Sequence, residues 1–113
     1  MAGVREAKQA ALQALRAGQT AGSVDRAARR VLERSGLGRF FIHSTGHGLG
    51  TEVHEGPRLG RGQEQEICVG NVVTLEPGVY VEGVGGIRIE DDVAVHASGP
   101  EVLTSVPTGL LEL

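Results

Sequence analysis

The sequence predicts an α+β domain in which two helices are followed by a curved antiparallel sheet. The first third of the chain is rich in helix-forming residues with one-face helical spacing, whereas the rest consists of short runs of Val, Ile and Leu broken by glycine. Helices grouped before strands, rather than alternating with them, are typical of the α+β class. The length of 113 residues suits one small domain.

Two helices are predicted at the start of the chain. Residues 3–17 are mostly Ala, Leu, Gln, Arg and Lys, which favour helix, and Gly18 stands where a C-terminal cap belongs. In the second helix, apolar residues recur at helical spacing after Ser23, the expected N-cap, and Gly36 is the expected end.

The charged residues of the second helix suggest a helix exposed on one side. Asp25 is expected in the first turn, where a carboxylate interacts favourably with the helix dipole. The cationic run in the later turns is interpreted as a solvated face and not as a nucleic-acid patch: Arg29, Arg30 and Arg34.

Short β-like runs separated by glycine follow residue 38. Gly83, Gly85 and Gly86 suit a tight turn between two of them. The predicted strands are residues 40–43, 72–75, 79–81, 87–89, 93–95 and 102–103.

The composition argues against nucleic-acid and membrane partners. The net charge is −3 and aromatic residues make up 3%, so neither a cationic footprint nor a base-stacking platform is expected. No stretch approaches the ~20 apolar residues that a membrane span needs. The single cysteine, Cys68, is expected to be a buried small hydrophobe, and the N-terminus does not resemble a signal peptide. We therefore expect a cytoplasmic protein.

Three clusters in the β-rich part carry chemically active side chains. The first places His43, His47 and His54 among glycines, the second contains Glu76 before a proline, and the third contains Glu90. Neutral imidazoles and carboxylates that converge from separate strands form hydrolytic sites for divalent cations. Taken singly, each residue could equally be structural or exposed to solvent.

Two other interpretations of the first cluster fit less well. His43 and His47 have the spacing of a zinc-binding helix, but no Glu follows His43 and the interspersed glycines oppose a helix. The glycine spacing also resembles a nucleotide-binding loop, yet the third glycine is not in the required place. His96, in a surface-like turn, is interpreted as structural.

The three clusters together resemble the C-terminal half of the pita-bread metallopeptidases. Their order is His-x-x-Gly-His-x-x-Gly-x-x-x-His-Glu-x-Pro, then Thr-x-Glu-Pro-Gly-x-Tyr, then Gly-x-Arg-Ile-Glu-Asp, and the resemblance covers nearly the whole chain. The Arg-Ile-Glu-Asp run resembles the proline-specific members, aminopeptidase P and prolidase. The resemblance implies that residues 1–113 are the C-terminal half of a pita-bread catalytic domain. The complete protein would then hydrolyse peptides that have proline in the second position.

The resemblance also implies a site for two divalent metal ions. His47 and Glu76 would be terminal ligands of one ion, and Glu90 would bridge the two. Such ion pairs activate water and polarise the scissile carbonyl. Mn²⁺ is the expected metal, with Co²⁺ or Zn²⁺ as alternatives.

By the same resemblance, two histidines would line the substrate side and other residues would support the metal ligands. His43 and His54 would donate hydrogen bonds and transfer protons. Arg88 would orient the bridging carboxylate, and Tyr80 is a weaker candidate for a similar role.

The family's dinuclear site also takes two aspartates upstream of the paired helices, and no aspartate of this chain matches them. We therefore expect these residues alone to bind one ion weakly or none, and not to cleave Xaa-Pro bonds. The face that meets the other half should drive formation of a homodimer or higher oligomer. The alternative is a non-catalytic pita-bread-like module for binding or oligomerisation.

Overall fold

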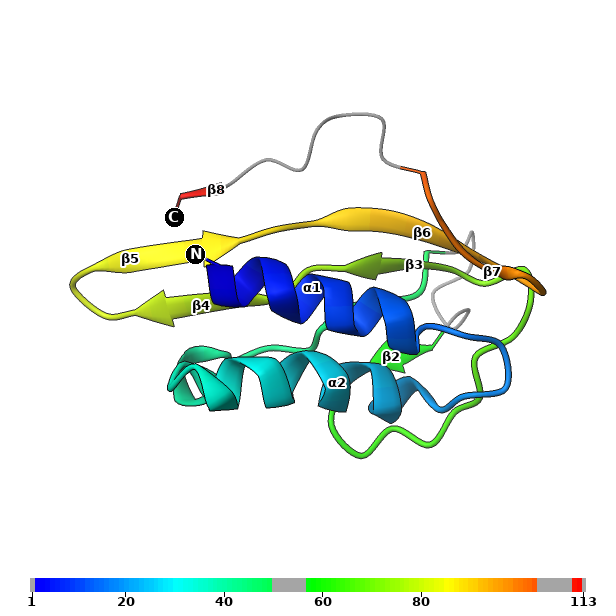
Figure 1. Cartoon of the computed structure of the whole chain (residues 1–113), viewed down its shortest axis with the longest axis horizontal. Coiled ribbons are helices and arrows are strands. Elements are labelled where there is room, and N and C mark those ends of the chain that lie inside the picture. The colour runs from blue at the N-terminus through cyan, green and yellow to red at the C-terminus, as the bar shows by residue number, and fades with distance from the viewer. Residues whose placement is uncertain (1, 50–56, 104–110, 113) are drawn as a thin grey trace.

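The computed structural model describes residues 2–49, 57–103 and 111–112, and it has two helices followed by antiparallel strands (Figure 1). This confirms the predicted α+β class. The elements are α1 (Ala2–Ala14), α2 (Ala21–Arg34), the 3-10 helix η1 (Gly38–Phe40), β1 (Gly46–His47), β2 (Arg58–Leu59), β3 (Val72–Leu75), β4 (Gly78–Val81), β5 (Gly85–Arg88), β6 (Asp91–His96), β7 (Gly99–Val102) and β8 (Leu111–Glu112).

The N-cap of α2 is Thr20, so the prediction of Ser23 was wrong. The Ser23 amide donates to Thr20 Oγ1 at 3.2 Å, and the Ser23 hydroxyl donates to the Thr20 carbonyl at 2.7 Å. Ser23 lies within the first turn of α2, where a backbone amide has no acceptor inside the helix. The Thr20 hydroxyl provides that acceptor, as an N-cap side chain does.

Helix α2 ends at Arg34, and Gly36 terminates it as predicted. Gly36 has φ +76°, and its amide donates to the Glu33 carbonyl at 3.0 Å. The Leu37 amide donates to the Leu32 carbonyl at 2.7 Å, which completes a Schellman motif. Among the described residues, no helix has the length and apolar character needed to cross a membrane.

Two antiparallel sheets account for most of the strands, in the orders β3-β6-β7 and β4-β5-β8, and β1 pairs with β2 separately. In Figure 1, β5 continues into β6 along the length of the molecule. The hairpin between β4 and β5 turns at Gly83 and Gly85, which have φ +80° and +122°. The predicted strands from residue 72 onward overlap β3 to β7.

The predicted strand at residues 40–43 was wrong. Phe40 ends η1, and the Phe41 amide donates to the Gly38 carbonyl at 3.1 Å. The Phe41 carbonyl accepts from Arg29 Nη1 at 3.0 Å. The amide and the carbonyl of Phe41, which a strand would use to pair with a neighbouring strand, are therefore already bonded to the η1 turn and to Arg29 of α2.

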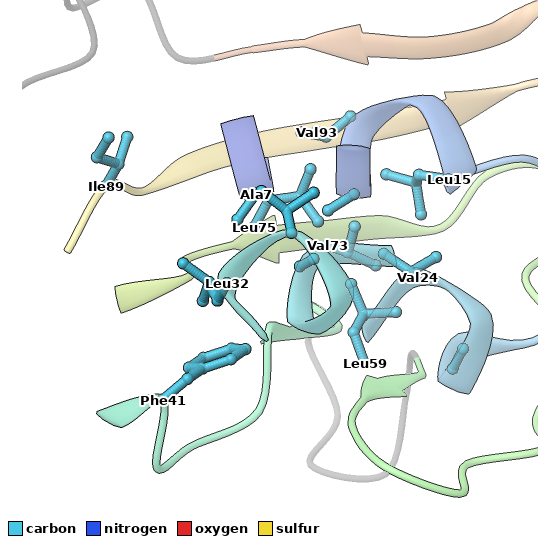
Figure 2. Close-up of a cluster of buried hydrophobic side chains, with 14 of the residues drawn as sticks. Ala7, Leu15, Val24, Leu32, Phe41, Leu59, Val73, Leu75, Ile89 and Val93 are labelled. Carbon is cyan, nitrogen blue, oxygen red and sulfur yellow. The ribbon is translucent and has the colours of Figure 1, made fainter. Parts of the chain in front are cut away.

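The core lies between the helix pair and the strands. Figure 2 shows Ala7, Val24 and Leu32 of the helices, and Leu15 just after α1, gathered with Val73, Leu75 and Val93 of the strands. The buried Lys8 of α1 lies with Nζ 2.6 Å from Oδ2 of Asp91 in β6, which ties the helix to the sheet.

Cys68 is exposed, so its predicted burial was wrong. Its neighbour Ile67 is the buried residue of this run. The Cys68 amide donates to Asn71 Oδ1 at 2.8 Å in a turn before β3, which leaves the thiol on the outside.

Candidate active site

Residues 45–49 run alongside β3 and bring the first and second sequence clusters together. The Glu76 amide donates to the Thr45 carbonyl at 2.6 Å. The His47 amide donates to Thr74 Oγ1 at 3.0 Å. These bonds place the side chains of His47 and Glu76 next to each other.

Gly46 allows this close approach. A Cβ atom at Gly46 would overlap the carbonyl oxygen of Thr74 in β3. Any larger residue would push β1 away from β3, so glycine is required here by contact with the neighbouring backbone.

His47 presents its Nε2 atom to Glu76. The two atoms His47 Nε2 and Glu76 Oε2 lie 3.7 Å apart. His47 Nδ1 lies 3.0 Å from the Gly48 carbonyl, which can only accept, so in the neutral imidazole Nδ1 is the donor and Nε2 carries the lone pair. The imidazole is 56% exposed and the Glu76 side chain 18% exposed. This tautomer and orientation suit a metal-binding imidazole.

Arg88 lies at the end of β5 with its guanidinium near Glu90. Arg88 Nη2 and Glu90 Oε1 are 3.8 Å apart, and the Glu90 side chain is 41% exposed. Among the described residues, no group of three or more His, Cys, Asp or Glu side chains could hold a metal ion. The bridging role of Glu90 therefore remains a prediction, and His54 lies outside the described residues.

His43 is held edge-on between two aromatic rings. Its ring centroid is 5.0 Å from that of Phe41 and 5.4 Å from that of Tyr80. Nδ1 donates to the Ser44 carbonyl at 2.7 Å, which leaves Nε2 as the acceptor. This Nε2 is buried and has no hydrogen-bond partner among the described residues. His43 thus has one nitrogen available for a ligand.

A cleft of about 730 Å³ connects these side chains. Arg58, in β2, lines this cleft, and its Nε donates to Ser44 Oγ at 3.1 Å. The site residues predicted from the sequence did not include Arg58, although it directly follows the Pro of the first motif. Ile42, also on the wall, is 73% exposed. The lining comprises Ile42, His43, Ser44, Gly46, His47, Gly48, Pro57, Arg58, Glu76 and Arg88.

Asp25 and Arg29 form a buried pair, contrary to both predictions for them. Arg29 Nε donates to Asp25 Oδ2 at 2.8 Å, and Nη2 donates to Oδ1 at 3.1 Å. Asp25 is 1% exposed and the Arg29 side chain 11%, whereas Arg30 is exposed. Asp25 lies beyond the first turn of α2, so it does not serve the helix dipole. The four-residue spacing of Asp25 and Arg29 could have indicated this ion pair from the sequence, since opposite charges at i and i+4 lie on the same helix face.

The donor set at His47 and Glu76 fits a divalent metal ion. An imidazole Nε2 and a carboxylate oxygen are ligands for Zn²⁺, Mn²⁺ and related ions. Two ligands of one ion are roughly 3–3.5 Å apart when each lies ~2.1 Å from it, close to the 3.7 Å observed. Two ligands do not complete a site, so others must join them.

Known proteins are similar to this chain in sequence and in fold. Residues 1–97 match the family Peptidase_M24, metallopeptidase family M24. The chain is 43% identical over 108 residues to an Xaa-Pro dipeptidase of Pyrococcus furiosus, covering 96% of this chain and 31% of that protein. It is 49% identical over 105 residues to an agropine synthesis cyclase of Rhizobium rhizogenes, covering 93% of this chain and 26% of that protein.

Among solved structures, the prolidase of Pyrococcus horikoshii superposes with a TM-score of 0.90 at 39% identity, covering 97% of this chain and 32% of that one. The chain thus spans about a third of the length of these relatives, and its fold is the pita-bread fold. The match over most of the sequence shows that this chain belongs to metallopeptidase family M24.

Proposed function

We propose that the complete protein is a metal-dependent peptidase that hydrolyses the bond before proline. The observation that carries the proposal is the His47–Glu76 pair, which brings an imidazole Nε2 and a carboxylate within 3.7 Å of each other on the wall of a large cleft. The relatives described as Xaa-Pro dipeptidase and prolidase support the proline specificity.

The metal site would be held by His47, Glu76 and Glu90. When bound, divalent ions would supply Lewis-acid activation of the scissile carbonyl and of the attacking water. Mn²⁺ is the proposed metal, with Co²⁺ or Zn²⁺ as alternatives. Arg88 would hold the Glu90 carboxylate in orientation, since its guanidinium already lies 3.8 Å away.

His43 would act on the substrate through Nε2. Because Nδ1 donates to the Ser44 carbonyl, Nε2 can accept a hydrogen bond or a proton at a fixed position. The neighbouring rings of Phe41 and Tyr80 restrict rotation of the imidazole. His54 would complete the substrate side of the site.

Arg58 would bind a substrate carboxylate. Its guanidinium lies on the cleft wall, where Nε donates to Ser44 Oγ at 3.1 Å, and among the described residues its other N–H groups make no hydrogen bond. A guanidinium pairs well with a planar carboxylate. A dipeptide carries its C-terminal carboxylate on the proline, so Arg58→Gln should raise KM for an Xaa-Pro dipeptide more than for a longer peptide. Arg30→Gln, on the exposed face of α2, is the matched control.

An assay of the complete protein tests this function. The chelator-treated protein would receive Mn²⁺, Co²⁺ or Zn²⁺ and be given an Xaa-Pro dipeptide, a longer Xaa-Pro peptide and matched Xaa-Ala peptides. We expect cleavage before proline that is lost on chelation and best restored by Mn²⁺. Equal cleavage of Xaa-Ala would contradict proline specificity. Metal binding without any turnover would favour the alternative of a non-catalytic binding or oligomerisation module.

For residues 1–113 alone, we propose weak binding of one ion or none, no cleavage, and a homodimer or higher oligomer. The reason is the ligand count, since three protein ligands carry too little negative charge to hold two dications. Calorimetry, light scattering and the same assay test this. Two tightly bound ions, a monomer mass at all concentrations, or proline release would each contradict one part. We also propose that the complete protein is cytoplasmic, which fractionation would test.

A further inference from the structure

Arg29 of α2 holds the segment that carries His43. Nη1 donates to the Phe41 carbonyl at 3.0 Å, and Nη2 donates to the His43 carbonyl at 3.1 Å. The guanidinium carbon also lies 4.3 Å from the centre of the Phe41 ring. One side chain therefore fixes the backbone on both sides of Ile42 and the ring that packs against the His43 imidazole.

Asp25 holds the next part of the same segment. Its Oδ1 accepts from the Thr45 amide at 3.1 Å and from the Thr45 hydroxyl at 2.8 Å. The Thr45 carbonyl in turn accepts from the Glu76 amide at 2.6 Å. A continuous set of hydrogen bonds thus runs from α2 through Thr45 to the backbone of Glu76.

The segment has no strand ladder of its own, so side-chain bonds such as those of Asp25 and Arg29 carry part of its positioning. Residues 41–45 form no strand in the structure, and the Thr45 amide shares its hydrogen between Asp25 and the Leu59 carbonyl, 2.9 Å away. Loops are positioned by such side-chain contacts when no ladder is available.

We propose that Asp25 and Arg29 are a positioning pair for the active site, fixing the His43 carbonyl directly and the His47–Glu76 arrangement through Thr45. This inference rests on the proposed function, since it assigns the pair a part in the same site. A pair needed only for stability could be replaced by apolar residues at little cost. This pair also makes directional bonds to Phe41, His43 and Thr45, and those bonds set geometry.

The choice of arginine over lysine separates positioning from charge. A guanidinium presents five N–H donors in a rigid fork, and Arg29 uses it to reach both oxygens of Asp25 and two carbonyls at once. A lysine ammonium would keep the charge beside Asp25 but cannot span all four acceptors. Arg29→Lys should therefore keep most of the stability and lose the geometry.

The test compares Arg29→Lys with Arg30→Gln in the complete protein. For Arg29→Lys we expect cooperative unfolding near the wild-type midpoint, but faster amide hydrogen exchange at residues 41–47 and a kcat about 10–100-fold lower at a KM within about threefold. Arg30→Gln, an exposed residue of the same helix, should match the wild type. Wild-type kcat and wild-type exchange in Arg29→Lys would overturn the proposal.

Thr45→Val and Thr45→Ser provide a milder second pair. Valine removes only the hydroxyl that donates to Asp25, so amide hydrogen exchange at residues 43–47 should become faster and kcat should fall about 3–10-fold. Serine keeps the hydroxyl and should have the exchange rates and the kcat of the wild type. Equal behaviour of the two variants would overturn the proposal. If the wild-type protein cleaves no Xaa-Pro peptide, the proposed function fails, and the exchange measurements still decide whether the pair holds the segment.

Discussion

The contact between α1 and β6 differs from the cleft in how its buried polar groups are satisfied. Lys8 and Asp91 are almost fully buried and lie 2.6 Å apart, Nζ to Oδ2. On the cleft side, His43 Nε2 and Arg88 Nε are buried without a hydrogen-bond partner among the described residues. Buried polar atoms are normally paired, so an unpaired one requires a specific explanation.

Buried polar groups therefore serve two purposes in this molecule, one structural and one for ligand binding. The α1–β6 contact is complete once the chain has folded, so changes there should alter the free energy of unfolding. The cleft keeps hydrogen-bonding capacity for a ligand, so changes there should alter turnover and metal affinity more than stability. The following predictions test this separation, from the largest effect to the smallest.

Loss of either proposed metal ligand should have the largest effect. In the complete protein, Glu76→Ala or His47→Ala should lower kcat/KM roughly a thousandfold or more, because the Lewis acid contributes several kcal/mol to the barrier and each 1.4 kcal/mol is tenfold. The free energy of unfolding of the metal-free His47→Ala protein should change by about 0.5 kcal/mol or less, since the imidazole is 56% exposed.

The control for this prediction is His96→Ala. His96 is exposed at the end of β6, where Nε2 lies 2.7 Å from Glu101 Oε1, away from the cleft lining. Its removal should leave turnover unchanged. Retention of a tenth of the wild-type activity by either cleft variant would remove that residue from the metal site.

Breaking the buried ion pair should have the opposite signature. Lys8→Met leaves the Asp91 carboxylate buried without its ammonium and should cost about 3 kcal/mol of unfolding free energy, measured by urea titration. The metal affinity of the folded protein should stay within about threefold of the wild type. Arg5→Met, an exposed position on the same helix, should change stability by about 0.5 kcal/mol or less.

The double variant Lys8→Met/Asp91→Leu sharpens this prediction. Replacing both charges with apolar groups should recover most of the loss, because the cost of the single variant lies mainly in the orphaned charge. A double variant as unstable as Lys8→Met would show that the pair contributes through geometry and not through mutual compensation.

Local patterns in the sequence were sufficient for most of the elements. Helical periodicity and Gly36 gave the end of α2, and the apolar runs after residue 72 gave the strands. Prediction failed where tertiary contacts override local preference. Phe40 and Phe41 have strand-forming side chains, yet Arg29 and the η1 turn take up the backbone groups of Phe41.

The candidate site was predictable as a set of residues but not as a geometry. The motif order identified His47 and Glu76, which the structure places together. Their meeting depends on Gly46 lying against Thr74 and on the bond between Thr45 and Glu76, neither of which a spacing rule contains. Arg29 was misread for the same reason, because a cation on a helix is usually solvated and only its tertiary partners show otherwise.

The smallest predicted effect concerns Thr74, which lies between the two regions because its strand β3 pairs with β6 and its hydroxyl supports the cleft. Its Oγ1 accepts from the His47 amide at 3.0 Å, and the residue is 2% exposed. Thr74→Val has almost the same shape, so it creates no cavity but leaves that amide without its acceptor. We expect a loss of about 1–2 kcal/mol in unfolding free energy and about a tenfold loss of metal affinity, because the contact that orients the His47 backbone would be lost.

Thr74→Ser keeps the oxygen and should retain the metal affinity despite its missing methyl group. Competition with a chelating dye gives the affinity of each variant, and amide exchange at His47 reports the broken bond. Equal metal affinity in the Val and Ser variants would show that this bond supports the strand alone and does not position His47 for a metal ion.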